Sequence, residues 1–136
     1  MNNCFIILAA GESKRFNSII PKPYLIYKGK PLIKHSIDKA LKNKIINKVV
    51  IVVNKKHKRY FKKLKLKHIN LINGGKTRAD SALKALKSIK KYKFKNVLIH
   101  DAARPNFSVK LLEKIVKELK NTKCVIPAIK TNDSVK

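Results

Sequence analysis

The order of apolar and polar positions divides the chain into uniform apolar runs and amphipathic stretches. The uniform runs are typical of strands buried on both faces of a sheet, and they cover Asn3–Ala9, Lys48–Val53, Ile69–Ile72, Asn96–His100 and Cys124–Ala128. Between them, apolar residues recur at helical spacing from Pro31 to Leu41, in the Lys-rich stretch Lys55–Lys67, from Ala79 to Ile89, and over Val109–Leu119 after the expected N-cap Ser108. Strands that alternate with helices predict an α/β fold, a three-layer α/β/α sandwich around a mainly parallel sheet.

The unusual residues of the chain follow the predicted strands. Three of the four glycines and three of the four arginines lie in such post-strand segments. In open parallel sheets, ligands bind in the crevice beyond the carboxyl ends of the strands. The sequence therefore predicts that these segments come together in one ligand site.

The segment after the first strand combines small residues with two cations. Its small residues are Ala9, Ala10 and Gly11, and its cations are Arg15 and Lys22. Small residues let backbone N–H groups approach a ligand closely, and the cations favour an anionic one. The segment matches neither the Walker A pattern nor G-x-G-x-x-G, so an ordinary glycine turn with solvated bases stays open as an alternative.

A second segment places two glycines before a helix. Gly74 and Gly75 precede the predicted helix, and Arg78 and Ser81 lie in its first turns. Free backbone donors and the helix dipole make such a place a seat for an anion or a nucleobase. A plain loop-to-helix turn with Thr77 as N-cap is the alternative.

A third segment carries a carboxylate at the end of an apolar strand. Asp101 is costly there unless it is paired or binds a metal, and Arg104 is near enough to pair with it or to bind a substrate phosphate. A structural ion pair is the alternative. We expect His100 to orient the loop that follows. The fourth segment, which contains Ser134, means nothing by itself.

Length and composition predict one domain with a real core. The chain has 136 residues, 44% of them hydrophobic, and no apolar run approaches the roughly 18 residues of a membrane span. Its beginning lacks the basic leader of a secretory signal, so we expect a cytoplasmic protein without a membrane partner. Cys4 and Cys124 lie in apolar runs without metal-ligand spacing, which predicts two buried thiols.

The net charge of +27 raises the alternative of a basic nucleic-acid-binding domain. Thirty of the 34 basic residues are lysines, however, and they are spread along the whole chain. Phosphate and base recognition usually relies on arginine, and no aromatic-studded reading surface is evident. We therefore expect no specific nucleic-acid partner.

Taken together, the segments resemble the 2-C-methyl-D-erythritol 4-phosphate cytidylyltransferase family. The resemblance rests on L-A-A-G-x-x-x-R at 8–15, P-K at 21–22, G-G-x-x-R-x-x-S at 74–81, H-D-A-A-R-P at 100–105 and D-S-V-K at 133–136. It implies a Rossmann-like nucleotidyltransferase fold of the GT-A-like type. It also implies transfer of CMP from CTP to the polyol phosphate with release of pyrophosphate, in the non-mevalonate route to isoprenoid precursors.

The resemblance implies a role for each matching residue. Arg15 and Lys22 would stabilise the charge at the α-phosphate, and Asp101 would hold Mg²⁺ or another divalent cation. Asp101, Arg104 and Ser134 would lie at the acceptor phosphate. CTP would be seated by Ala9, Ala10, Gly11, Gly74, Gly75, Arg78 and Ser81.

Two departures from the family pattern matter. Ser134 stands where the family usually has threonine, which keeps the hydroxyl, and the chain stops at Lys136 while complete members continue. We therefore expect residues 1–136 to be a nucleotide-binding domain truncated at its C-terminal end, poorly active alone and homodimeric when complete. A ribitol 5-phosphate cytidylyltransferase, or an enzyme fused to the later cyclase of the pathway, stays open as an alternative.

Overall fold

The computed structural model describes residues 2–12, 18–67 and 69–130. The chain divides into two units, Met1–Asn106 and Phe107–Lys136. The first unit contains the sheet and all but one of the α-helices found in the described residues; the second contains α4 (Val109–Glu118). Among the described residues, no helix has the length and apolar character needed to cross a bilayer.

The sheet of the first unit is fully parallel. Its four strands are β1 (Asn3–Ala9), β4 (Lys48–Val53), β5 (Asn70–Asn73) and β6 (Asn96–Asp101), in the order β5-β4-β1-β6. β1 and β4 cover the predicted ranges, and β5 and β6 differ from them by a residue. The predicted α/β fold with a parallel sheet is confirmed.

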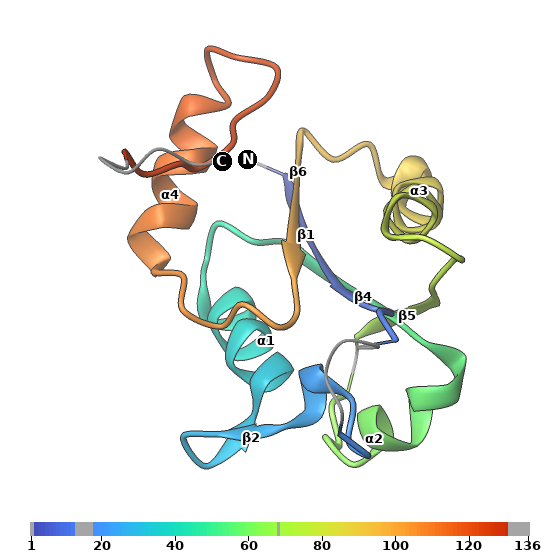
Figure 1. Cartoon of the computed structure of the whole chain (residues 1–136). Coiled ribbons are helices and arrows are strands. Elements are labelled where there is room, and N and C mark those ends of the chain that lie inside the picture. Colours follow the sequence, from blue (N-terminus) through green and yellow to red (C-terminus); the bar gives the residue numbers. More distant parts are fainter. Residues whose placement is uncertain (1, 13–17, 68, 131–136) are drawn as a thin grey trace. The chain divides into compact units, whose positions relative to one another are not determined.

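Two helices cover the two faces of the sheet, which makes three layers. Figure 1 shows α1 (Leu32–Lys42) and α3 (Arg78–Ile89) on opposite sides of the strands. Successive side chains of a strand point to opposite faces. On the α3 side, Cys4, Ile6 and Leu8 pack in one core with Ala85 and Ile89.

The connections place the carboxyl end of β1 at a topological switch point. α1 lies between β1 and β4 in the chain, and α3 lies between β5 and β6, so the chain leaves β1 toward one edge of the sheet and returns on its other side. Ligands of doubly wound sheets bind where the strand order reverses in this way. The loops after β1 and β6 are therefore expected to line the site.

Short elements decorate the first unit. They are the 3₁₀ helices η1 (Lys22–Tyr24), η2 (Lys55–His57) and η3 (Lys90–Tyr92), the hairpin of β2 (Ile26–Tyr27) and β3 (Lys30–Pro31), and α2 (Lys58–Lys62). The short helix predicted within Lys55–Lys67 is α2, which is five residues long. The chain turns after it, with hydrogen bonds from Leu64 N to the Phe61 carbonyl and from Lys65 N to the Lys62 carbonyl, and Lys65 adopts a left-handed backbone (φ 49°).

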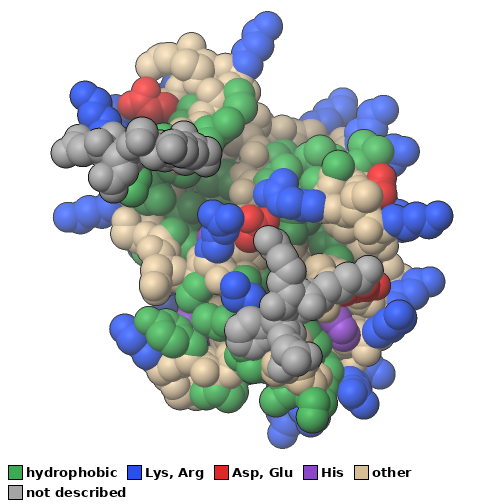
Figure 2. Space-filling model, in the orientation of Figure 1, with side chains coloured by type: hydrophobic (Ala, Val, Ile, Leu, Met, Phe, Trp, Pro, Cys, Tyr) green, Lys and Arg blue, Asp and Glu red, His purple; other side chains and the backbone are tan. Residues whose placement is uncertain are grey.

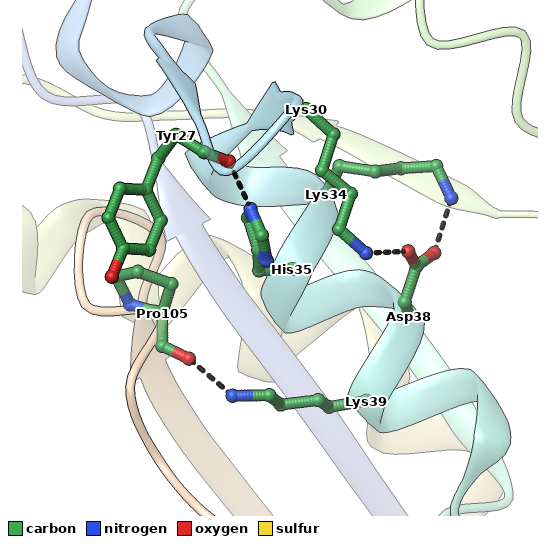
Figure 3. Close-up of polar contacts among 7 residues, drawn as sticks. All are labelled: Tyr27, Lys30, Lys34, His35, Asp38, Lys39 and Pro105. Atoms are coloured by element: carbon green, nitrogen blue, oxygen red, sulfur yellow. Dashed lines mark hydrogen bonds and ion pairs between the residues drawn. The ribbon is translucent and has the colours of Figure 1, made fainter.

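Lysines join α1 to the hairpin that precedes it. Figure 3 shows Asp38 between Lys30 and Lys34, with 2.6 Å between Lys30 Nζ and Asp38 Oδ2. On the same helix, His35 Nε2 lies 2.7 Å from the carbonyl oxygen of Tyr27. These contacts fix the start of α1 against β2 and β3.

Removing this carboxylate should make stability less dependent on pH. Burial alone would raise the pKa of Asp38, but the hydrogen bonds and charges of Lys30 and Lys34 outweigh it and lower the pKa below its ordinary 3.8. A lowered folded-state pKa contributes stability above the unfolded-state value, which is lost as the pH falls through the folded-state value. We expect Asp38→Asn to cost about 1 kcal/mol at pH 7 and less below pH 4. Urea unfolding of both proteins at pH 7 and pH 3 measures this; an equal difference at both pH values would contradict it.

Of two predictions for the second unit, one is confirmed and the other is wrong. α4 is capped as predicted, because Ser108 Oγ accepts a hydrogen bond from Leu111 N over 3.1 Å. The predicted strand Cys124–Ala128 is wrong, since these described residues form no strand. An apolar run predicts burial but supplies no pairing partner, and a strand exists only when its backbone is paired.

The two cysteines differ in burial. Cys4 is fully buried in β1, and burial raises the pKa of its thiol to about 11. Cys124 is exposed, so the prediction of a second buried thiol is wrong. Its apolar neighbours are exposed with it: Ile126 and Ile129 are among the exposed large hydrophobic side chains.

Positive charge is spread over the molecule. Figure 2 shows Lys and Arg side chains projecting all around the visible face rather than gathering in one stripe. The lysines that are spread along the sequence are therefore also spread over this face.

Candidate functional site

A cavity of about 430 Å³ lies at the carboxyl ends of the strands. It is lined by Leu8, Ala10, Gly11, Glu12, Asn54, Gly75, Lys76, Thr77, Arg78, Ser81 and Asp101. The lining comes from the segments after β1, β4, β5 and β6. The structure therefore brings together three of the four segments that the sequence singled out.

The β1 segment contributes Leu8, Ala10, Gly11 and Glu12 to the cavity wall. Ala9 is buried as the last residue of β1, and the Ala10 carbonyl oxygen accepts a hydrogen bond from Asn54 Nδ2 over 3.3 Å. A Cβ added to Gly11 would meet no atom within 4 Å. Arg15, the first predicted cation, lies outside the described residues.

Lys22 is held by its neighbours while its own side chain is exposed. It begins η1 between the buried residues Pro21 and Pro23. The next residue, Tyr24, stacks on Tyr60 of α2 with ring centroids 5.4 Å apart. Lys22 is not among the residues that line the cavity.

The glycine pair is required by close packing. A Cβ on Gly74 would overlap that of Ala10 and lie 3.0 Å from Ser81 Oγ, while one on Gly75 would overlap Asp80. The Gly75 N–H donates to Ser81 Oγ over 3.0 Å, and Gly74 N donates to the Val53 carbonyl over 2.9 Å. Gly74 thus lets the loop lie directly against the β1 segment, and Gly75 lets it lie against the first turn of α3.

The start of α3 is also capped as the alternative interpretation expects. Thr77 Oγ1 accepts from Asp80 N over 3.0 Å, and Thr77 N donates to Asp80 Oδ2 over 3.1 Å. This capping box leaves Thr77 and its neighbour Arg78 on the cavity wall. Capping and cavity lining therefore coexist in this segment.

Asp101 joins two of the predicted segments. Its carboxylate is one-third exposed, with Arg78 Nε 3.1 Å from Oδ1 and Arg104 Nε 3.4 Å from Oδ2. The ion pair with Arg104, which the sequence left open as the alternative, is present, and the one with Arg78 was not anticipated. The Arg78 and Arg104 side chains are 65% and 80% exposed, and such pairs are typically worth about 0–1 kcal/mol. Replacing Asp101 by a phosphate as the partner of either guanidinium would therefore cost little free energy.

The described residues fit a divalent cation only with help from a ligand. They contain no group of three or more His, Cys, Asp or Glu side chains able to hold a metal ion. Mg²⁺ prefers oxygen ligands and is usually held by one or two carboxylates plus substrate phosphates. Asp101, at the cavity wall, is suited to that arrangement, and Glu12 is the other carboxylate on the wall.

Asn54 is a site residue that sequence reasoning missed. It follows β4 and lines the cavity, where its Nδ2 binds the Ala10 carbonyl and its Oδ1 accepts from Lys56 N over 2.9 Å. The rule that residues after strands carry the chemistry could have found it. Ser134, nominated for the acceptor side, lies outside the described residues.

Comparisons with known proteins agree on one family. The family model of IspD, 2-C-methyl-D-erythritol 4-phosphate cytidylyltransferase, matches residues 3–136. A bifunctional enzyme IspD/IspF from Pelagibacter ubique is 68% identical over all of this chain and 37% of its own length. The 2-C-methyl-D-erythritol 4-phosphate cytidylyltransferase of Thermotoga neapolitana is 36% identical over 98% of this chain and 61% of its own.

Solved structures support the same assignment. The bifunctional IspDF from Campylobacter jejuni superposes with a TM-score of 0.85 and 31% identity, over 100% of this chain and 35% of that one. The 4-diphosphocytidyl-2C-methyl-D-erythritol synthase from Anaerococcus prevotii gives a TM-score of 0.84 and 30% identity, over 99% and 58%. The chain thus spans between about a third and three-fifths of these relatives. It belongs to the 2-C-methyl-D-erythritol 4-phosphate cytidylyltransferase family.

Proposed function

We propose that the protein carrying this chain transfers CMP from CTP to 2-C-methyl-D-erythritol 4-phosphate and releases pyrophosphate. The observation that carries the proposal is the cavity in which Gly75, Arg78 and Asp101 meet. A phosphate oxygen of the acceptor attacks the α-phosphorus, and the bond from that phosphorus to the bridging oxygen of the leaving pyrophosphate breaks. Such transfers depend on positioning and on cations around an in-line displacement, so no protein nucleophile is required.

The nucleotide is proposed to bind at the small residues of the cavity, where a ligand can approach the backbone closely. Ala10 and Gly11 line one part of the cavity and Gly75 another. Ala9 and Gly74 are not among the lining residues, and the packing of Gly74 against Ala10 leaves no room for a side chain at Gly74. Ser81 is nearly fully buried behind Gly75 and fixes the orientation of its N–H. Backbone groups held this rigidly can select a base by shape and hydrogen bonding.

The charged side chains are proposed to bind the triphosphate and to stabilise its charge. Arg78 can leave Asp101 for a phosphate oxygen, and Lys22 and Arg15 would stabilise the charge that develops at the α-phosphorus. Asp101, released from Arg78, would then hold Mg²⁺, which supplies Lewis-acid stabilisation of that charge. The exposure of both ion pairs supports this exchange of partners.

The acceptor phosphate is proposed to bind at Arg104, which is paired with Asp101. Arg104 extends from the turn after β6 with its side chain largely exposed, as a phosphate-binding guanidinium must be. Ser134 and a homodimeric assembly complete the proposal on the strength of family resemblance. Residues 1–136 would then serve as the nucleotide-binding part of the activity.

Calorimetric titration with each of the four ribonucleoside triphosphates, with and without Mg²⁺ and at two salt concentrations, tests the nucleotide assignment. We expect CTP to bind selectively and to keep its affinity at moderate salt, and pyrophosphate release to require the acceptor. Equal binding of all four nucleotides that weakens steeply with salt would instead indicate attraction by charge alone and would overturn the proposal.

A further inference from the structure

The turn that follows β6 is anchored at its start by the sheet. Ala102 N donates to the Leu8 carbonyl over 3.0 Å, and Arg104 N donates to the Asp101 carbonyl over 3.1 Å, which closes the turn. Ala102 is buried, so this half of the turn is part of the core. The guanidinium of Arg104 extends from the other, exposed half.

The end of the turn is anchored by α1. Lys39 Nζ donates to the Pro105 carbonyl oxygen over 2.6 Å, and Figure 3 shows the lysine extending from α1 to that oxygen. Proline has no backbone N–H, so its carbonyl is the one backbone group it can use for hydrogen bonding. Lys39 therefore fixes the point at which the chain leaves the turn.

His100 links α1 to the middle of the turn. Its ring stacks on Phe5 with centroids 5.6 Å apart, and its Nε2 lies 3.3 Å from Oγ of Ser36, a fully buried residue of α1. The ring also forms a hydrogen bond with the backbone of Arg104. A neutral ring satisfies both contacts, because one ring nitrogen donates while the other accepts.

These contacts fix the backbone that carries Arg104. The guanidinium itself pairs with the carboxylate of Asp101, which is one-third exposed, at 3.4 Å. A side chain held so lightly is located chiefly by its backbone, and the backbone of this turn is held on one side by β1 and on the other by α1. Displacing the turn by an ångström would misplace the guanidinium by at least as much.

We propose that Ser36, Lys39 and His100 are positioning residues, through which α1 sets the place of the Arg104 guanidinium for the acceptor phosphate. None of the three lines the cavity. The inference rests on the proposed function, because it takes the acceptor phosphate as the partner of Arg104. It adds that the selectivity for the acceptor depends on α1, a helix whose residues do not line the cavity.

The test is Lys39→Met, which keeps the aliphatic stem and removes the ammonium group. Lys42→Met is the matched control, since Lys42 is an exposed lysine of the same helix. In the protein carrying this chain, we expect Lys39→Met to raise KM for 2-C-methyl-D-erythritol 4-phosphate roughly tenfold, with KM for CTP and the melting temperature unchanged. Lys42→Met should leave both KM values unchanged. Unchanged KM values in Lys39→Met, or an equal rise of both together with a lower melting temperature, would overturn the proposal.

A second readout is independent of turnover. We expect the backbone amide resonances of Ala102, Ala103 and Arg104 to shift in Lys39→Met and in Ser36→Ala, and to stay in place in Lys42→Met. If the wild-type protein fails to use the acceptor, the proposed function fails, and the amide shifts alone decide whether α1 positions the turn. Resonances that stay in place in both α1 variants would overturn it.

Discussion

Asp101→Ala is expected to lower kcat/KM at saturating Mg²⁺ roughly a thousandfold while leaving the fold intact. The fold should survive because the carboxylate is one-third exposed and its two arginine partners are mostly exposed, so no buried charge is left unpaired. Activity should fall because the described residues contain no group of three or more metal-ligating side chains that could hold the ion in place of Asp101. Steady-state kinetics and circular dichroism together measure both outcomes.

Metal-free binding distinguishes this explanation from a general loss of the site. Without Mg²⁺, Asp101→Ala should still bind CTP, because Arg78 is then free to meet the phosphates; addition of Mg²⁺ should no longer tighten binding. Glu113→Ala, which removes an exposed acid of α4 that does not line the cavity, is the control and should behave as the wild type. Wild-type turnover in Asp101→Ala would remove this residue from the metal role.

Gly74→Ala should have the second largest effect, on stability and CTP affinity together. The added methyl group would overlap Cβ of Ala10 and crowd Ser81 Oγ, so the β5 loop must move away from β1. Forcing a methyl group into a packed contact costs about 1–3 kcal/mol. CTP affinity should fall about tenfold or more, because the two cavity walls separate and a shift of this size can cost up to about a hundredfold.

Gly11→Ala is the matched control for the stability measurement. A methyl group there meets no atom within 4 Å, so urea unfolding should show a loss within about 0.5 kcal/mol. The larger loss for Gly74→Ala should appear in the same assay. Equal stability of the two variants would show that the contact between the loop and Ala10 is not a constraint on the fold.

The fold was predictable where burial alone decides the structure. β1 and β4 lie inside the sheet, so nearly all their side chains are buried and their sequences are uniformly apolar. The same criterion fails at Cys124–Ala128, because apolar character does not specify a pairing partner. The short helix predicted within Lys55–Lys67 is present as α2.

The sequence predicted which residues belong to the site but not which contacts they make with one another. The rule about strand ends correctly joins Gly75, Arg78 and Asp101 in one cavity. It does not predict that Arg78 contacts a carboxylate 23 residues away, since that depends on how α3 approaches the end of β6. Asn54 was missed because an isolated asparagine resembles any other loop residue until the Ala10 carbonyl is seen beside it.

The central position of β1 has a consequence for synthesis and folding. Its pairing with β6 joins positions as far apart as Asn3 and Asn96, which lie 93 residues apart in sequence and share a hydrogen bond of 2.8 Å. Contacts of such sequence separation form slowly, and a chain emerging from the ribosome cannot make them until β6 has left the exit tunnel. The cavity needs Asp101 at the end of β6, so the nascent chain becomes able to bind its nucleotide only after β6 has paired with β1.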